Sequence, residues 1–184
     1  WYQNNLISYS VYISIEAGFC NDRSVNLTDE VWWDGDTKLG YGTNKTAYGP
    51  FGRLYAIDTW KAIQTPSLRC SQKSDLFTVR ESGQGNQALD YPIGLITADE
   101  VVYAGGFGGS NNTDYYLYTN LNYRTMSPYC HPDSAVFIVN ANGFIGNGGV
   151  RNSNSIRPVI NLDANVTLSG SGTSTDPYVV EGAM

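Results

Sequence analysis

Cys130 and His131 are the residues to test first for chemistry, because a cysteine and a histidine can form a nucleophile and its base. The pair works only when the two side chains converge. Immediate neighbours on an extended chain point apart, so their adjacency favours a surface binding role for His131. The sequence also lacks a Gly-x-Ser-x-Gly elbow and a His-Glu-x-x-His helix, and its GGFGGS segment (105–110) lacks the Lys of a phosphate-binding loop. We therefore expect no enzymatic activity and no catalytic residues.

Acidic residues cluster around the VWWDGD segment. An oxygen-rich loop of this kind could bind calcium, but EF-hand spacing is missing and a solvated acidic loop is the favoured interpretation. The residues of this cluster are Asp29, Glu30, Asp34 and Asp36. We expect no metal or cofactor, with calcium kept as the open alternative.

The three cysteines do not have the close spacing of a zinc site. Cys20 and Cys70 each lie between an apolar residue and a polar loop, which favours a disulfide between them over two buried free thiols. Closing a loop of this length would stabilise the fold by up to about 4 kcal/mol in the chain-entropy model. Cys130 would then be left unpaired.

Composition limits the classes of partner. The chain has 184 residues and a formal net charge of -6. Without a cluster of Lys and Arg, binding to nucleic acid or to an anionic membrane is disfavoured, and no apolar run is long enough to span a bilayer. Abundant Tyr, Asn, Gly, Ser and Thr are typical of extracellular β-rich binding domains. Because the chain begins at Trp1 rather than at Met, we expect it to be a piece of a longer protein.

The N-terminal half contains few regular elements. Residues 1–15 begin as an amphipathic helix and are then ambiguous between helix and strand. Residues 20–66 are rich in turns and aromatics, which predicts a long, ordered, irregular excursion. In the segment GLITADE, a short strand precedes a helix for which Thr97 is the N-cap and Glu100 completes a capping box. Capping is favoured over metal binding for Asp99 and Glu100, and Gly105 and the next glycine end the helix.

The C-terminal half alternates stiff apolar segments with polar runs. The segments YYLY, AVFIV and IRPVINL are expected to be core strands. Asn142–Gly143 predicts a hairpin turn, and Pro158 predicts an edge, a strand start or a bulge. The tail NVTLSGSGTSTDPYVV predicts a two-stranded flap. We predict one α+β domain over residues 1–184, with two short helices before a twisted antiparallel sheet.

The succession WYQNNL, GFCNDRS, RCSQKSDLFT, GLITADE, VFIVNANGFI and IRPVINL resembles a domain of large surface proteins in gut Gram-positive bacteria. It is similar to the C-type lectin-like fold, in the subclass shared with formylglycine-generating enzymes. Members commonly have Trp where this chain has Arg124, and Gly where it has Ile156. Those enzymes carry a reactive cysteine pair that Cys130 alone cannot supply, so the resemblance implies binding rather than oxidation.

Domains of this fold also serve as the variable proteins of diversity-generating retroelements, in which mutagenesis at adenines alters chosen codons. Residues 120–155 are rich in the amino acids that mutated Asn codons encode. An ordinary loop rich in Asn and Gly would show the same composition.

We therefore expect a non-catalytic domain that is extracellular or at a bacterial or phage surface, anchored by regions absent from this chain. We expect it to bind a protein or glycan receptor on another cell or host surface. Aromatic and Arg side chains would supply contact area, and Asn would supply adaptable hydrogen bonds. The candidate contact residues are Asn120, Asn122, Arg124, Tyr129, His131, Asp133, Phe137, Asn140, Asn142, Phe144, Asn147, Arg151, Asn152 and Asn154. Core packing is an equal alternative for Phe137 and Phe144. A calcium-dependent lectin and a structural pilus or surface module remain the alternatives for the whole chain.

Overall fold

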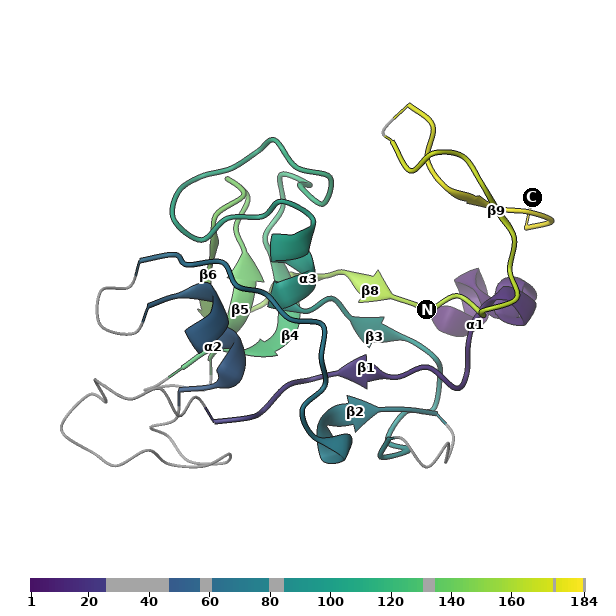
Figure 1. The fold of residues 1–184 in the computed structure, drawn as a ribbon, viewed down its shortest axis with the longest axis horizontal. Helices are drawn as coiled ribbons and strands as arrows, with labels where there is room; N and C mark the ends of the chain where they lie inside the picture. Colours follow the sequence, from purple (N-terminus) through teal and green to yellow (C-terminus); the bar gives the residue numbers. More distant parts are fainter. Residues whose placement is uncertain (26–46, 57–60, 80–84, 131–134, 174, 184) are drawn as a thin grey trace.

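A four-stranded sheet lies behind the helices α2 (Gly49–Leu54) and α3 (Ala98–Tyr103) in the computed structural model (Figure 1). The structure describes residues 1–25, 47–56, 61–79, 85–130, 135–173 and 175–183. The strand order is β6-β5-β4-β7, and β4 pairs antiparallel with β5, as does β5 with β6. The strands are β4 (Tyr123–Pro128), β5 (Ala135–Val139), β6 (Ile145–Gly149) and β7 (Ser155–Ile156). The prediction of a wholly antiparallel sheet is wrong at β7, which lies at the edge opposite β6 and runs parallel to β4.

The hairpin predicted at Asn142–Gly143 is confirmed. It joins β5 to β6, with Val139 opposite Ile145 in the register. Gly143 has a φ of 79°, and a Cβ added there would lie 1.5 Å from the carbonyl oxygen of Asn112. Glycine is therefore required both for the left-handed backbone and for the close approach of a second loop.

Helix α3 (Ala98–Tyr103) begins and ends where its local signals predict. The Thr97 hydroxyl accepts from the Glu100 amide, and the Glu100 carboxylate accepts from the Thr97 amide, so the capping box is complete. After the helix, Gly105 has a φ of 98°. The short strand predicted before it is β3 (Gly94–Leu95).

The IRPVINL segment is divided between two sheets rather than forming one strand. Its first residue, Ile156, ends β7, whereas β8 (Pro158–Val159) pairs antiparallel with β3. Pro158 thus begins a strand, which is one of the roles predicted for it. Arg157, between the two strands, donates to the carbonyl of Leu117 at 2.6 Å and lies over the ring of Tyr123.

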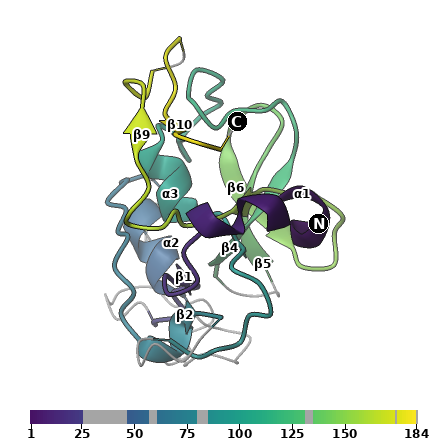
Figure 2. The same ribbon diagram turned by 90° about the vertical axis from the view of Figure 1, so that its right-hand side faces the viewer.

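The N-terminal and C-terminal segments lie together at one end of the molecule (Figures 1 and 2). Ile13 forms an antiparallel bridge with Leu162, and the Tyr12 hydroxyl donates to the carbonyl of Gly182. The predicted C-terminal flap is confirmed as an antiparallel strand pair. The elements of this end are α1 (Tyr2–Asn5), the 3-10 helix η1 (Ile7–Tyr12), β9 (Leu168–Ser169) and β10 (Val179–Val180).

Two predictions about regular elements are wrong. The helix α2 (Gly49–Leu54) lies in a segment predicted to be irregular, and its buried Phe51 and Leu54 show that packing outweighs the low helix propensity of GPFGRL. The YYLY segment is a turn rather than a strand, closed by a hydrogen bond from the Tyr118 amide to the Tyr115 carbonyl. Tyr115 packs against the core, while Tyr116 is exposed.

The main core fills the space between the two helices α2 and α3 and the sheet. Phe51, Val101, Phe137 and Ile145 are completely buried there. A smaller antiparallel pair consists of β1 (Phe19–Cys20) and β2 (Leu76–Phe77). The 3-10 helix η3 (Lys73–Asp75) directly precedes β2 in the chain. Among the described residues, no helix is long and apolar enough to cross a membrane.

Candidate binding surface

Arg124 fixes the backbone of the loop that follows β6. Its guanidinium donates to the carbonyls of Gly149, Val150 and Asn152 at 2.5–3.2 Å. A planar guanidinium with several fixed donors is suited to holding several carbonyls at once. Arg124 was predicted to contact a ligand, but its donors are used inside the chain, and its role here is to position residues 149–152.

The turn between β5 and β6 is held in a similar way. The side-chain oxygen of Asn122 accepts from the Ala141 amide at 2.7 Å, and the Tyr118 hydroxyl donates to the Ala141 carbonyl at 3.0 Å. Asn142 donates to the side-chain oxygen of Asn111 at 2.9 Å. Two of the predicted contact residues, Asn122 and Asn142, therefore hold the turn with their own amide groups.

The side chains that these anchors display are exposed and polar. Asn147 on β6, and Arg151 and Asn152 in the loop, make no side-chain hydrogen bond or ion pair within the part of the chain that the structure describes. Asn154 is half-buried and likewise has no such bond among the described residues. Asn120 is exposed, has a φ of 56°, and accepts a long hydrogen bond from Tyr118.

Two predicted contact residues belong to the core instead. Phe137 is completely buried, and Tyr129 is 5% exposed. Their rings meet edge to face with centroids 4.7 Å apart, and Phe51 packs edge to face on Tyr129 as well. Burial also raises the pKa of the Tyr129 hydroxyl. The prediction for Phe137 is corrected, because its inward-facing position on β5 is completely buried. Tyr129, which follows β4, is also packed in the core, but it lines the pocket described next. His131 and Asp133 lie outside the described residues.

A pocket of about 650 Å³ opens beside the predicted surface. We call it the aromatic–amide pocket. Its walls include Tyr55, Lys61, Phe107, Asn140, Phe144 and Asn147. Phe107 and Phe144 form a parallel bridge, and the Ile145 amide donates to the carbonyl of Phe107. Four of the predicted contacts line this pocket, namely Tyr129, Asn140, Phe144 and Asn147.

Three of these wall residues were missed by the sequence analysis, because Tyr55, Lys61 and Phe107 are distant from the predicted segment along the chain. The available signal was the pair of glycines after Phe107. A Cβ on Gly108 would lie 2.2 Å from the Tyr55 hydroxyl oxygen, and one on Gly109 would lie 2.4 Å from the Phe107 ring. The GGFGGS segment thus provides close packing of aromatic rings against bare backbone.

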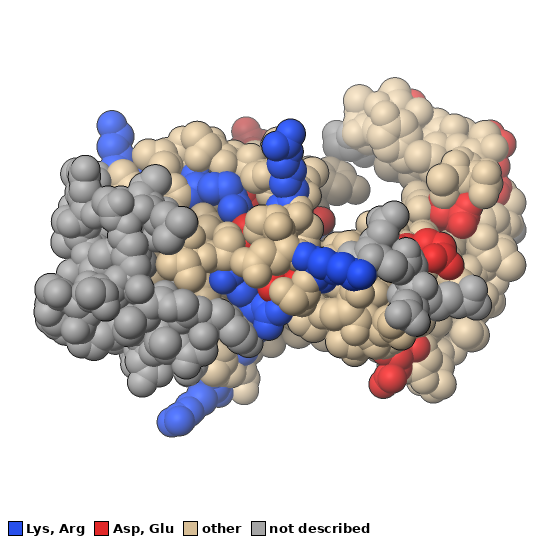
Figure 3. All heavy atoms as spheres, turned by 60° about the horizontal axis from the view of Figure 1, so that its bottom comes forward, with Lys and Arg blue, Asp and Glu red and all other residues tan. Residues whose placement is uncertain are grey.

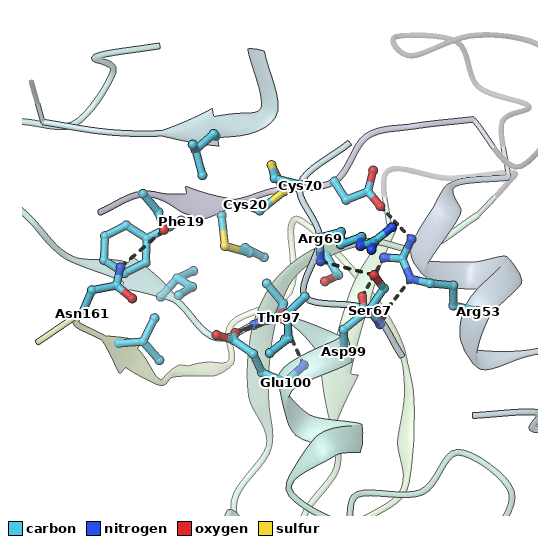
Figure 4. Close-up of a pocket in the computed structure, with 18 of the residues that line it drawn as sticks. Phe19, Cys20, Arg53, Ser67, Arg69, Cys70, Thr97, Asp99, Glu100 and Asn161 are labelled. Carbon is cyan, nitrogen blue, oxygen red and sulfur yellow. Dashed lines mark hydrogen bonds and ion pairs between the residues drawn. A yellow bond between two sulfur atoms is a disulfide. The ribbon is translucent and has the colours of Figure 1, made fainter. Parts of the chain in front are cut away.

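A second pocket, of about 270 Å³, lies beside the predicted disulfide (Figure 4). Cys20 and Cys70 are bonded, with Cα atoms 5.6 Å apart. Nearby, Arg53 pairs with Asp22 and Asp99 at 2.7 and 2.8 Å. The Asp99 carboxylate also accepts from the Ser67 amide at 2.8 Å. The pairing of Asp99 was not predicted, because its partner lies 46 residues away.

The electrostatics of this network are those of a closed ion cluster. Burial by itself raises the pKa of Asp22, but hydrogen bonds from Ser24 and Arg53, with the attraction of the guanidinium, bring that pKa below 3.8. Arg53 is held charged in the same way, because its two carboxylate partners outweigh burial and raise its pKa. Figure 3 shows Lys and Arg side chains mixed with acidic ones over the middle of one face. Through these ion pairs, Arg53 links Asp22, which follows β1, to Asp99 of α3.

Cys130 and the acidic residues are the remaining candidates for chemistry. Cys130 is buried, and burial raises the pKa of its thiol to about 12, which keeps it protonated at neutral pH. Within the described ranges, no group of three or more His, Cys, Asp or Glu side chains could hold a metal ion. The acidic cluster at 29–36 lies outside those ranges. Comparison with known proteins finds no matching family model, no similar curated protein and no similar solved structure.

Proposed function

We propose that the chain is a non-catalytic ligand-binding domain that acts at a bacterial or phage surface and binds a protein or glycan receptor. The observation that carries the proposal is the rigid display of free polar side chains. Arg124 holds the backbone of the 149–152 loop, while the side chains of Asn147, Arg151 and Asn152 make no hydrogen bond or ion pair among the described residues. A backbone that is ordered before binding loses less entropy when a partner is bound.

An extracellular location is supported by the bond between Cys20 and Cys70. Disulfides persist in oxidising compartments and are rare in reducing ones. A C-type lectin-like frame is supported by the sequence resemblance described above and agrees with the mixed helices and sheets. We extend the proposal to that fold and to a variable protein of a diversity-generating retroelement.

The binding surface can be tested with a double variant, Arg151→Ala with Asn152→Ala. The wild-type chain is first applied to an array of cell-surface proteins and oligosaccharides, and the strongest partner is then measured by surface plasmon resonance. We expect the double variant to weaken binding about tenfold or more, the loss expected at an interface centre. The matched control, Asn4→Ala with Arg69→Ala, removes one Asn and one Arg elsewhere on the surface. Equal losses in the two variants would refute the assigned surface.

The proposed diversification has a separate test in the DNA beside the gene. We expect a reverse transcriptase gene and a near-copy of the region that encodes residues 115–162. The two copies should differ at adenines, at codons for exposed residues such as Asn147 and Asn152. A near-copy whose differences fall on codons for buried residues such as Phe137 would contradict this assignment.

A further inference from the structure

The aromatic–amide pocket has an apolar floor that is kept open by glycine. The half-buried rings of Phe107 and Phe144 lie beside each other on bridged segments. A Cβ on Gly146 would lie 2.9 Å from the Phe144 ring and 3.4 Å from the amide nitrogen of Asn140. A side chain at this position would therefore displace the Phe144 ring. The floor is a pair of fixed rings over bare backbone, to which the flat apolar face of a ligand can be fitted.

The rim of the same pocket carries polar groups of a particular kind. The side-chain amides of Asn140 and Asn147 make no hydrogen bond to any described residue. Each amide can donate and accept at the same time. Lys61 adds an exposed donor, and no Asp or Glu is found among the described residues of the wall. The rim is therefore suited to groups that also donate and accept, and hydroxyls are the commonest of these.

We propose that this pocket binds one sugar ring of a glycan, without calcium. This rests on the proposed function, whose ligand class it names. A sugar ring presents C–H groups on one face and hydroxyls at its edge, which matches an aromatic floor beneath an amide rim. The volume of about 650 Å³ lies within the range of ordinary ligand sites, roughly 300–1,000 Å³. Since the described wall contains no carboxylate, the sugar is held by stacking and amide hydrogen bonds and needs no bridging cation.

The test is an array of immobilised oligosaccharides that includes hexoses, N-acetylhexosamines, fucose and uronic acids. The full chain is applied in a buffer that contains a calcium chelator. We expect binding to at least one glycan family, with unchanged signal when calcium replaces the chelator. An array with no bound glycan would overturn the proposal, and so would binding that requires calcium.

Variants then assign the binding to the pocket, with the glycan found on the array titrated by calorimetry. Phe144→Leu keeps apolar volume but removes the ring, and we expect about tenfold weaker binding. Asn147→Ala should have a similar effect, whereas Phe144→Tyr should bind like the wild-type chain. The matched control is Asn4→Ala, which removes an exposed amide outside both the pocket and the assigned binding surface. Thermal unfolding of each variant separates loss of binding from loss of the fold. Full affinity in both Phe144→Leu and Asn147→Ala would overturn the assignment.

The outcome also separates this inference from the proposed function. If the chain binds a protein through Arg151 and Asn152 but binds no glycan, the proposed function holds and the sugar site is refuted. If it binds neither a protein nor a glycan on either array, both proposals are refuted.

Discussion

Arg53 is the residue on which several distant parts of the chain depend. Its guanidinium donates to both oxygens of Asp99 and to one oxygen of Asp22, each at 2.7–2.8 Å. Both carboxylates are nearly completely buried. Because charge buried without a partner is costly, these two acids depend on this one cation.

Arg53→Met should consequently destabilise the chain strongly. Met preserves much of the apolar volume of the side chain, but two buried carboxylates would remain unpaired, at a cost of about 3–5 kcal/mol in the free energy of unfolding. Urea denaturation followed by circular dichroism measures this loss. The control is Arg151→Met, an exposed arginine, for which we expect a change within about 0.5 kcal/mol. A similar small effect for both variants would show that the ion cluster contributes little.

Single residues also show what sequence can predict about the site. The pattern of polar residue types predicted an exposed surface over residues 120–155, and Asn147, Arg151 and Asn152 within it are exposed. It could not distinguish Asn147, whose amide is free among the described residues, from Asn122, whose amide holds a turn. The difference is set by a partner 19 residues away, at Ala141, and no local pattern records it.

At the scale of elements, predictions succeeded where the signal is local. The capping box of α3 and the turn at Asn142–Gly143 each depend on residues within four positions. The helix α2 and the parallel strand β7 depend instead on what packs against them, and both were missed. The C-type lectin-like fold stays a proposal. Its elements would be short and joined by long connections, so distant contacts rather than local sequence decide how they are arranged.

The disulfide links two elements of the fold, and its contribution to the free energy of unfolding can be measured. It joins β1 to the loop before η3 across 50 residues of sequence. In the chain-entropy model, closing a loop of this size stabilises the fold by about 4 kcal/mol. The variant Cys20→Ser with Cys70→Ser should lose about that amount, measured by urea denaturation under oxidising conditions.

Cys130→Ser is the matched control, because Cys130 is a free, buried cysteine. Burying a hydroxyl in place of that thiol costs about 1–3 kcal/mol, which is expected to be less than the loss of the disulfide. Adding a reductant should lower the stability of the wild-type chain but leave the Cys20→Ser, Cys70→Ser variant unchanged. A wild-type chain equally stable with and without reductant would contradict the assigned value.

At the scale of the whole molecule, the fold separates the residues that hold the backbone from those that are displayed. The buried Phe137 is the cross-strand partner of the exposed Asn147, and Arg124 holds the carbonyls of the loop that carries Arg151 and Asn152. A surface can change without loss of the fold only if its own side chains contribute little to stability. This division makes a binding surface tolerant of substitution, which a diversified protein requires.

The triple variant Asn147→Tyr, Arg151→Ser, Asn152→Tyr tests that division directly. The three side chains are exposed and make no bond within the described residues, so each change should alter the free energy of unfolding by no more than about 0.5 kcal/mol. Arg124→Ala, a single change, should cost more, about 1–3 kcal/mol, because it removes the side-chain donor to the carbonyls of Val150 and Asn152 and one of the donors to that of Gly149. Thermal and urea unfolding of the two variants and the wild-type chain shows which variant is the less stable. A triple variant less stable than Arg124→Ala would mean that the displayed residues themselves maintain the fold, and the surface could not then vary freely.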